Sequence, residues 1–83
     1  MTGPAFKVGD RVKLLSIPRE VERDRSKFPE TFELFQVAVG RVFEIRGFGE
    51  YGHAELWLHP DGSPADTVVA DSVWVEPEYL LAV

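Results

Sequence analysis

Two histidines are the first residues in this 83-residue chain whose chemistry invites a metal. His53 and His59 lie six residues apart in a stretch that alternates like a β-strand. At strand rise they would share a face but stand roughly 20 Å apart, which is too far to bind one metal ion. Asp61 is a further oxygen ligand near His59, but Pro60 and Gly62 beside it indicate a turn. The sequence therefore predicts no metal site.

The sequence also lacks the patterns of a catalytic nucleophile and of a phosphate-binding loop. The chain has no cysteine, and its serines are not placed in a nucleophile elbow. Gly47, Gly49 and Gly52 are followed by no Lys or Arg, so they indicate a hairpin rather than a phosphate loop. Glu76 and Glu78 flank Pro77, where carboxylates are usually solvated. We expect no enzymatic activity and no cofactor.

Aromatic side chains are the remaining candidates for a binding surface. Tyr51, Trp57, Trp74 and Tyr79 are candidates to line a shallow partner-binding groove, because aromatic residues give a large contact area at low entropic cost. The alternative is that Trp74 and Tyr79 complete a small core. An acidic rim around such a groove favours a basic or neutral protein partner, and self-association is a further possibility.

Charge is divided unevenly along the chain. Residues 1–46 hold all nine Lys and Arg with seven of the fourteen acids, whereas residues 47–83 hold the other seven acids. A polyanion would be repelled by the second half, so a nucleic-acid surface would have to lie in the first. Its candidate contacts are Arg11, Lys13, Arg41 and Arg46. We expect no nucleic-acid partner, but keep this surface as the alternative.

Most of the candidate binding residues lie on short predicted strands. Alternation and Gly/Pro punctuation predict strands at about 10–16, 40–47, 53–59, 72–76 and 81–83, with an optional short strand at 67–69. Pro77–Leu80 is predicted to be one tight turn. The block 19–27, which alternates in charge, is predicted to be an exposed loop.

One short helix is predicted in the long connection after the first strand. Phe28, Phe32 and Phe35 have the spacing of one helical face, and Pro29 suits a first helical turn. We place this helix at about 29–36, with its phenylalanines as a lid over the core. Their alternative role is an aromatic recognition surface.

Short strands in so small a chain favour a mainly β fold. We expect residues 1–83 to form a single domain, a small five-stranded barrel with the short helix in the loop after the first strand. A chain of this length removes only about 60–65% of its unfolded surface from water, so the core must be compact.

Several motifs carry a resemblance to SH3-like barrels of the prokaryotic type. The run Phe6-Lys7-Val8-Gly9-Asp10-Arg11-Val12 and the later Gly40-Arg41-Val42 resemble KOW modules. The same run with Glu55-Leu56-Trp57 resembles the C-terminal domain of nitrile hydratase β subunits, and Glu76-Pro77-Glu78-Tyr79-Leu80 is similar to the Pro-x-x-Tyr turn of eukaryotic SH3 domains.

These resemblances imply a fold more strongly than a function. They suggest a non-catalytic bacterial module for protein interaction. The alternatives are a KOW-like nucleic-acid binder and an accessory subunit of an enzyme complex resembling nitrile hydratase. Nitrile hydratase takes its metal ligands from the other subunit, so the resemblance implies no catalytic residue here.

Location is suggested only by what the first residues lack. Met1–Ala5 carries no basic region or apolar stretch of a signal peptide, and no apolar run approaches the ~18–20 residues of a membrane span. We expect a cytoplasmic protein with no membrane partner.

Overall fold

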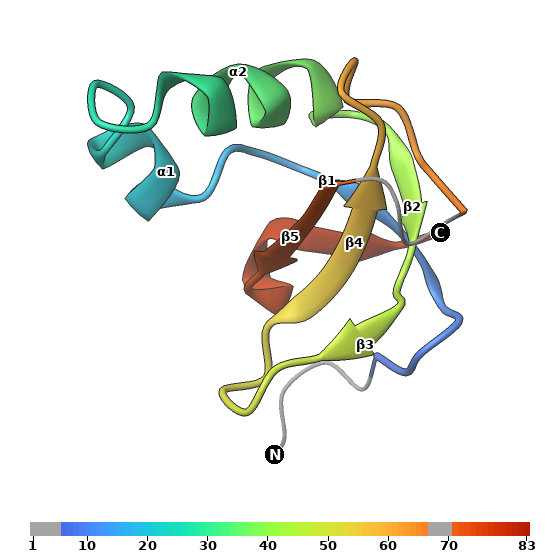
Figure 1. The fold of residues 1–83 in the computed structure, drawn as a ribbon. Helices are drawn as coiled ribbons and strands as arrows, with labels where there is room; N and C mark the ends of the chain where they lie inside the picture. The colour runs from blue at the N-terminus through green and yellow to red at the C-terminus, as the bar shows by residue number, and fades with distance from the viewer. Residues whose placement is uncertain (1–5, 67–70) are drawn as a thin grey trace.

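The structure is a computed structural model that describes residues 6–66 and 71–83 (Figure 1). Its strands and helices follow one another along the chain as β1 (Arg11–Leu14), α1 (Arg19–Arg23), α2 (Pro29–Ala38), β2 (Val42–Glu44), β3 (Gly47–Phe48), β4 (Ala54–Leu58), β5 (Asp71–Val75), the 3-10 helix η1 (Pro77–Tyr79) and β6 (Leu80–Ala82). The predicted strand at 67–69 lies outside the described residues.

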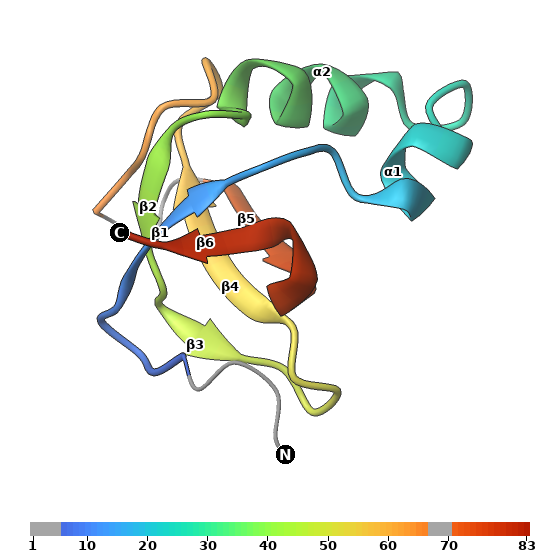
Figure 2. The same ribbon diagram turned by 180° about the vertical axis from the view of Figure 1, so that it is seen from behind.

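The strands form two antiparallel sheets of three strands each, in the orders β2-β1-β6 and β3-β4-β5. Figures 1 and 2 show the two sheets stacked, with β6 visible from behind. The fold is therefore mainly β, as the sequence predicted. Among the described residues no single sheet closes on itself, so the structure gives two three-stranded sheets where the sequence predicted a five-stranded barrel.

The predicted strand at 40–47 is divided between the two sheets. The Ile45 amide donates to the Asp10 carbonyl oxygen at 2.8 Å, whereas the Arg46 amide donates to the Glu55 carbonyl oxygen at 2.9 Å. The chain thus leaves the first sheet and joins the second between consecutive residues. Alternation alone predicted one strand here because both halves are extended.

Buried side chains fill the space between the sheets. The alternation in β1 and β4 is as predicted, with Val12 and Leu14 inward on β1 and the three even-numbered residues inward on β4. The core is completed by residues of the other elements: Phe35, Ala38, Phe43, Ile45, Val75 and Leu80. A sheet alone could not bury its apolar face, so α2 is held by the same core.

The predicted helix is confirmed as α2, but the prediction that its three phenylalanines together cover the core is wrong. Phe28 precedes the helix with non-helical backbone angles, and its side chain is 59% exposed. Phe32 is half-buried and lies beneath the Arg25 guanidinium, 5.6 Å from the ring centre. Phe35 and Ala38, three residues apart, instead attach the helix to the core.

The charged block also differs from the prediction, since Arg19–Arg23 forms helix α1 rather than a loop. Val21 is half-buried against the core, and the Arg19 amide donates to the Tyr79 hydroxyl at 3.2 Å. With one apolar residue in five, the segment shows no helical periodicity. Tertiary contact and the preceding Pro18 therefore determine its structure.

Candidate functional site

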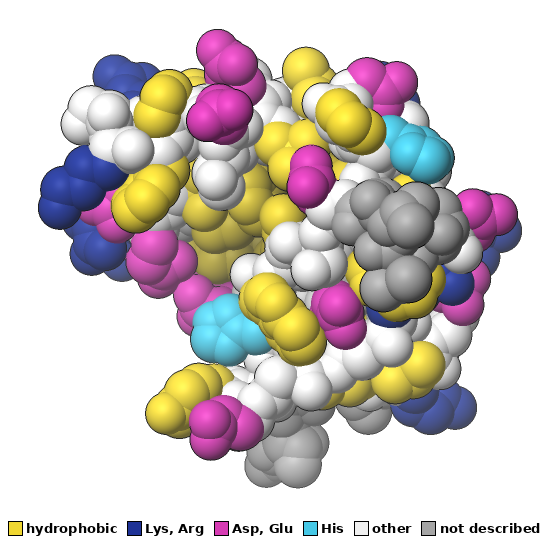
Figure 3. Space-filling model, viewed as in Figure 1, with side chains coloured by type: hydrophobic (Ala, Val, Ile, Leu, Met, Phe, Trp, Pro, Cys, Tyr) yellow, Lys and Arg dark blue, Asp and Glu magenta, His cyan; other side chains and the backbone are white. Residues whose placement is uncertain are grey.

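A hollow of about 550 Å³ lies between the helices and the edge of β5. Figure 3 shows it floored by hydrophobic side chains, with acidic side chains around it. The hollow is lined from three elements: Val21 of α1, then Glu30, Thr31, Leu34 and Phe35 of α2, and Asp71, Ser72, Val73 and Trp74 of β5. Leu34 and Val73 are half-buried and pack against the core. The floor is therefore continuous with the hydrophobic core.

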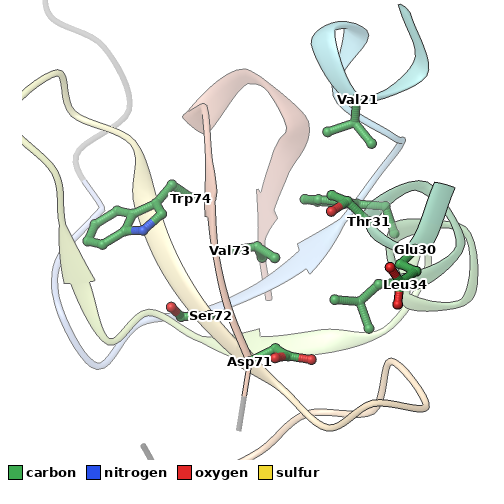
Figure 4. Close-up of a pocket in the computed structure, with 9 residues that line it drawn as sticks. Val21, Glu30, Thr31, Leu34, Asp71, Ser72, Val73 and Trp74 are labelled. Carbon is green, nitrogen blue, oxygen red and sulfur yellow. The ribbon is translucent and has the colours of Figure 1, made fainter. Parts of the chain in front are cut away.

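Four consecutive residues of β5 line this hollow, although successive side chains of a strand point to opposite faces. In the close-up of Figure 4, Val73 and Asp71 point toward α2, while Trp74 and Ser72 point away from it. Ser72 and Trp74 must therefore border the hollow through their backbone. The hollow consequently runs along the edge of β5 rather than over one of its faces.

Hydrogen bonds show which backbone groups of β5 face that edge. The carbonyl oxygens of Glu55 and Trp57 accept from Arg46 and Ala65, on the side of β4 away from β5. The even-numbered residues of β4 therefore face β5, where Leu56 pairs with Val73. It follows that Ser72 and Trp74 direct their amide and carbonyl groups to the open edge, which no strand among the described residues covers.

Acidic residues border the hollow. Glu30 and Asp71 line it and also line a neighbouring hollow of about 530 Å³, to which Glu33 and Asp61 contribute. Hydrogen bonds from the Ser63 hydroxyl and amide hold the pKa of Asp61 below its usual range, so this carboxylate stays charged at neutral pH. No Lys or Arg lines either hollow within the described residues.

Of the four predicted aromatic residues, the structure places two on one sheet and a third, Tyr51, in the turn between β3 and β4. Trp57 pairs with Ser72 and Trp74 with Glu55, so the two tryptophans share the outer face of β4 and β5 as diagonal neighbours. Trp74 is 49% exposed, and it borders a third hollow, of about 380 Å³, with Tyr51, which is 85% exposed. Trp74 is thus the aromatic residue common to two hollows.

Trp57 is already engaged by its neighbours. Its indole nitrogen donates to Glu55 Oε2 at 3.0 Å, and the Arg46 guanidinium lies 4.8 Å from its ring centre. Tyr79 stands apart from the other three, because its hydroxyl accepts from α1 and its ring packs against the core. Both residues therefore make contacts within the fold in the described structure.

The four predicted nucleic-acid contacts are placed differently from one another. Arg11 and Lys13 point outward on the same face of β1, and Arg41 donates to the Val37 carbonyl oxygen at 3.0 Å. Arg46 is turned inward, donating to the Ala65 carbonyl oxygen at 3.0 Å with Glu44 3.5 Å away. Arg11 and Arg46 border one hollow, together with the acidic Glu44 and Asp66.

The two histidines lie at opposite ends of β4, where His53 borders the hollow of Tyr51 and His59 is exposed. Among residues 6–66 and 71–83, no three His, Asp or Glu side chains gather as metal ligands. No helix in the same ranges is long and apolar enough to cross a membrane.

Sequence reasoning missed the residues that form the main hollow, namely Val21, Thr31, Leu34 and Val73. The sequence pattern could have indicated only some of these residues. Val73 and Val75 share a face of β5, where Val75 is buried, Val73 is half-buried and Asp71 is exposed, so burial decreases along this face toward the hollow. Which helix would stand beside it could not be read from local pattern.

Comparison with known proteins adds no family to this description. A scan against protein-family models found no match, and searches of curated proteins and of solved structures found none either.

Proposed function

We propose that this chain is a small, non-catalytic SH3-like module that binds another protein through the hollow between α2 and β5. Support for the SH3-like assignment comes from the segment Val42–Phe48, which passes from one three-stranded sheet to the other. The single 3-10 turn between β5 and β6 supports it as well. In this proposal the barrel is partly open, and the bent segment counts as one of its five strands.

The observation that carries the binding function is the hollow itself. It places a hydrophobic floor beside an uncovered strand edge, and the exposed Trp74 lies on the other face of that strand (Figure 4); apolar patches, free strand edges and exposed aromatic residues are features of surfaces where proteins bind one another. The candidate nucleic-acid surface has weaker support, because Arg46 is bonded within the fold and acids stand beside Arg11.

Site-specific photo-crosslinking in the native host tests the proposal. A photoreactive phenylalanine replaces Thr31, which is exposed and lines the hollow, and in a control replaces Gln36, which is exposed on α2 outside it. A protein adduct formed from position 31 but not from 36 supports the proposal. An enzyme subunit in that adduct would make the chain an accessory subunit, whereas a nucleic-acid adduct, or none, would contradict protein binding.

A further inference from the structure

We infer that the occupant of the hollow is an extended, positively charged segment of a partner protein, added as a strand to the open edge of β5. This inference rests on the proposed function and specifies how it is carried out. An uncovered strand edge presents a row of amide and carbonyl groups that pairs readily with another chain. Here the edge groups are those of Ser72 and Trp74, derived above from the bonds of β4.

The pattern of side chains that the added strand must carry follows from the pleat. A residue opposite Val73 points to the same face, toward Leu34 and Val21, where an apolar side chain is favoured. A residue opposite Asp71 lies two positions away on that same face, beside Glu30. The structure thus assigns an apolar residue and a Lys or Arg spaced i, i+2.

The other face of the added strand would lie beside Trp74. That ring is half exposed, so a second Lys or Arg on this face gains a cation–π contact. β5 spans five residues, Asp71–Val75, so we expect the recognised segment to be about as long. Side chains on both faces therefore contribute to the choice of partner.

Charge favours a cationic partner over a second copy of this chain. The hollow and its neighbour are bordered by Glu30, Glu33, Asp61 and Asp71. Two β5 strands paired edge to edge would bring this acidic border against its own copy, and the run Asp71–Glu76 contains no cation to compensate it. A basic segment is attracted to the same border.

The experiment begins with a display library of random linear ten-residue peptides, selected on the full chain. We expect enrichment of β-forming peptides with Lys or Arg two positions from Val, Ile or Phe. The tightest peptide is then measured by titration calorimetry against the wild type, Ser72→Pro and Ser72→Val. Proline removes the amide of residue 72, which faces the open edge and makes no hydrogen bond to β4, whereas valine keeps that amide. We therefore expect peptide binding to weaken about tenfold or more for Ser72→Pro and not for Ser72→Val.

A second measurement, with chemically modified peptides on the wild-type chain, does not depend on whether Ser72→Pro folds. N-methylation of the peptide at alternate residues should abolish binding, and at the intervening residues should not, because only every second amide faces β5. Loss without this alternation, or selection of proline-rich, helical or acidic peptides, would overturn strand addition and leave protein binding standing. Strand addition by a basic partner segment would also be overturned by a crosslink from position 31 with no peptide selected. A dimer of the free chain that Ser72→Pro abolishes would overturn it as well, because the occupant would then be a second copy. With neither peptide nor crosslink, the proposed function fails too.

Discussion

Val73 of β5 and Leu34 of α2 face each other across the hollow, and both rest on the core beneath it. Each is half-buried, although its neighbours Val75 and Phe35 are buried almost completely. The core thus continues outward between a helix and a strand edge and ends there without a covering element among the described residues. This relationship is the basis of the binding proposal.

A positive charge introduced into the hollow should weaken binding of a basic peptide. Thr31→Arg places a guanidinium near Glu30 and Asp71, and arginine forms helices better than threonine, so the fold should be retained. We expect about tenfold weaker binding at low salt, measured by calorimetry. Gln36→Arg, with the same chemistry on another side of α2, should change affinity less than about twofold.

Arg46 is predicted to stabilise the fold rather than to contact a ligand. Arg46→Met keeps the aliphatic stem but removes the hydrogen bond to Ala65 and the contact with Trp57. We expect a loss of about 1–2 kcal/mol of unfolding free energy in urea titrations. Lys13→Met, at an exposed position of β1, should cost less than about 0.5 kcal/mol. Equal effects of the two substitutions would show that Arg46 has no structural role.

Two glycines with the same backbone angle should respond differently to alanine. Gly52 and Gly62 have φ of 84° and 83°, so either substitution meets the left-handed penalty of about 1–2 kcal/mol. A Cβ at Gly52 would meet open space, whereas at Gly62 it would collide with the Val37 side chain of α2. Gly62→Ala should therefore cost about 2–4 kcal/mol in total, measured by urea unfolding. A Gly62→Ala variant as stable as Gly52→Ala would mean that the turn is not packed against α2.

The carboxylate of Glu76 should make stability depend on pH. Partial loss of solvent, reinforced by the charges of Glu20 and Glu78, raises the pKa of Glu76 above its usual value. The folded state then binds this proton more tightly than the unfolded state, so stability falls as pH rises from about 4.3 through the raised pKa.

Glu76→Gln removes that charge. We expect a higher melting temperature than wild type at pH 7 and a difference that disappears below about pH 4, where the wild-type carboxyl is protonated. The melting temperature measured from pH 3 to 8 checks this. Glu50→Gln, in the exposed β3–β4 hairpin, serves as the control and should not reproduce the trend. A Glu76→Gln gain that is constant with pH would contradict the stated cause.

Local pattern predicted what local physics determines. Alternation in Ala54–Leu58 reports burial directly, and Pro29 with the apolar spacing that follows it specifies α2. Pattern failed where tertiary contact decides. Val21 alone could not signal α1, and the residues predicted as one strand over 40–47 carry no mark of the change of sheet between Ile45 and Arg46.

The candidate site shows the same limit. Trp74 is one of the aromatic residues predicted to line a groove, and the structure leaves it half exposed. Trp57 is only half-buried as well, but its indole is bonded to Glu55 on the same strand face, and the Arg46 guanidinium lies over its ring, a contact that alternation along β4 does not predict. The hollow depends on α2 lying beside β5, a long-range packing relationship between residues about forty positions apart.

Amide hydrogen exchange at β5 tests strand addition most directly. In the free chain, the Val73 amide should exchange slowly because it faces β4, while the Ser72 and Trp74 amides should exchange rapidly at the open edge. With the selected basic peptide bound, we predict that Ser72 and Trp74 become protected by at least about tenfold. Unchanged exchange at these two amides in a saturated complex would contradict the account.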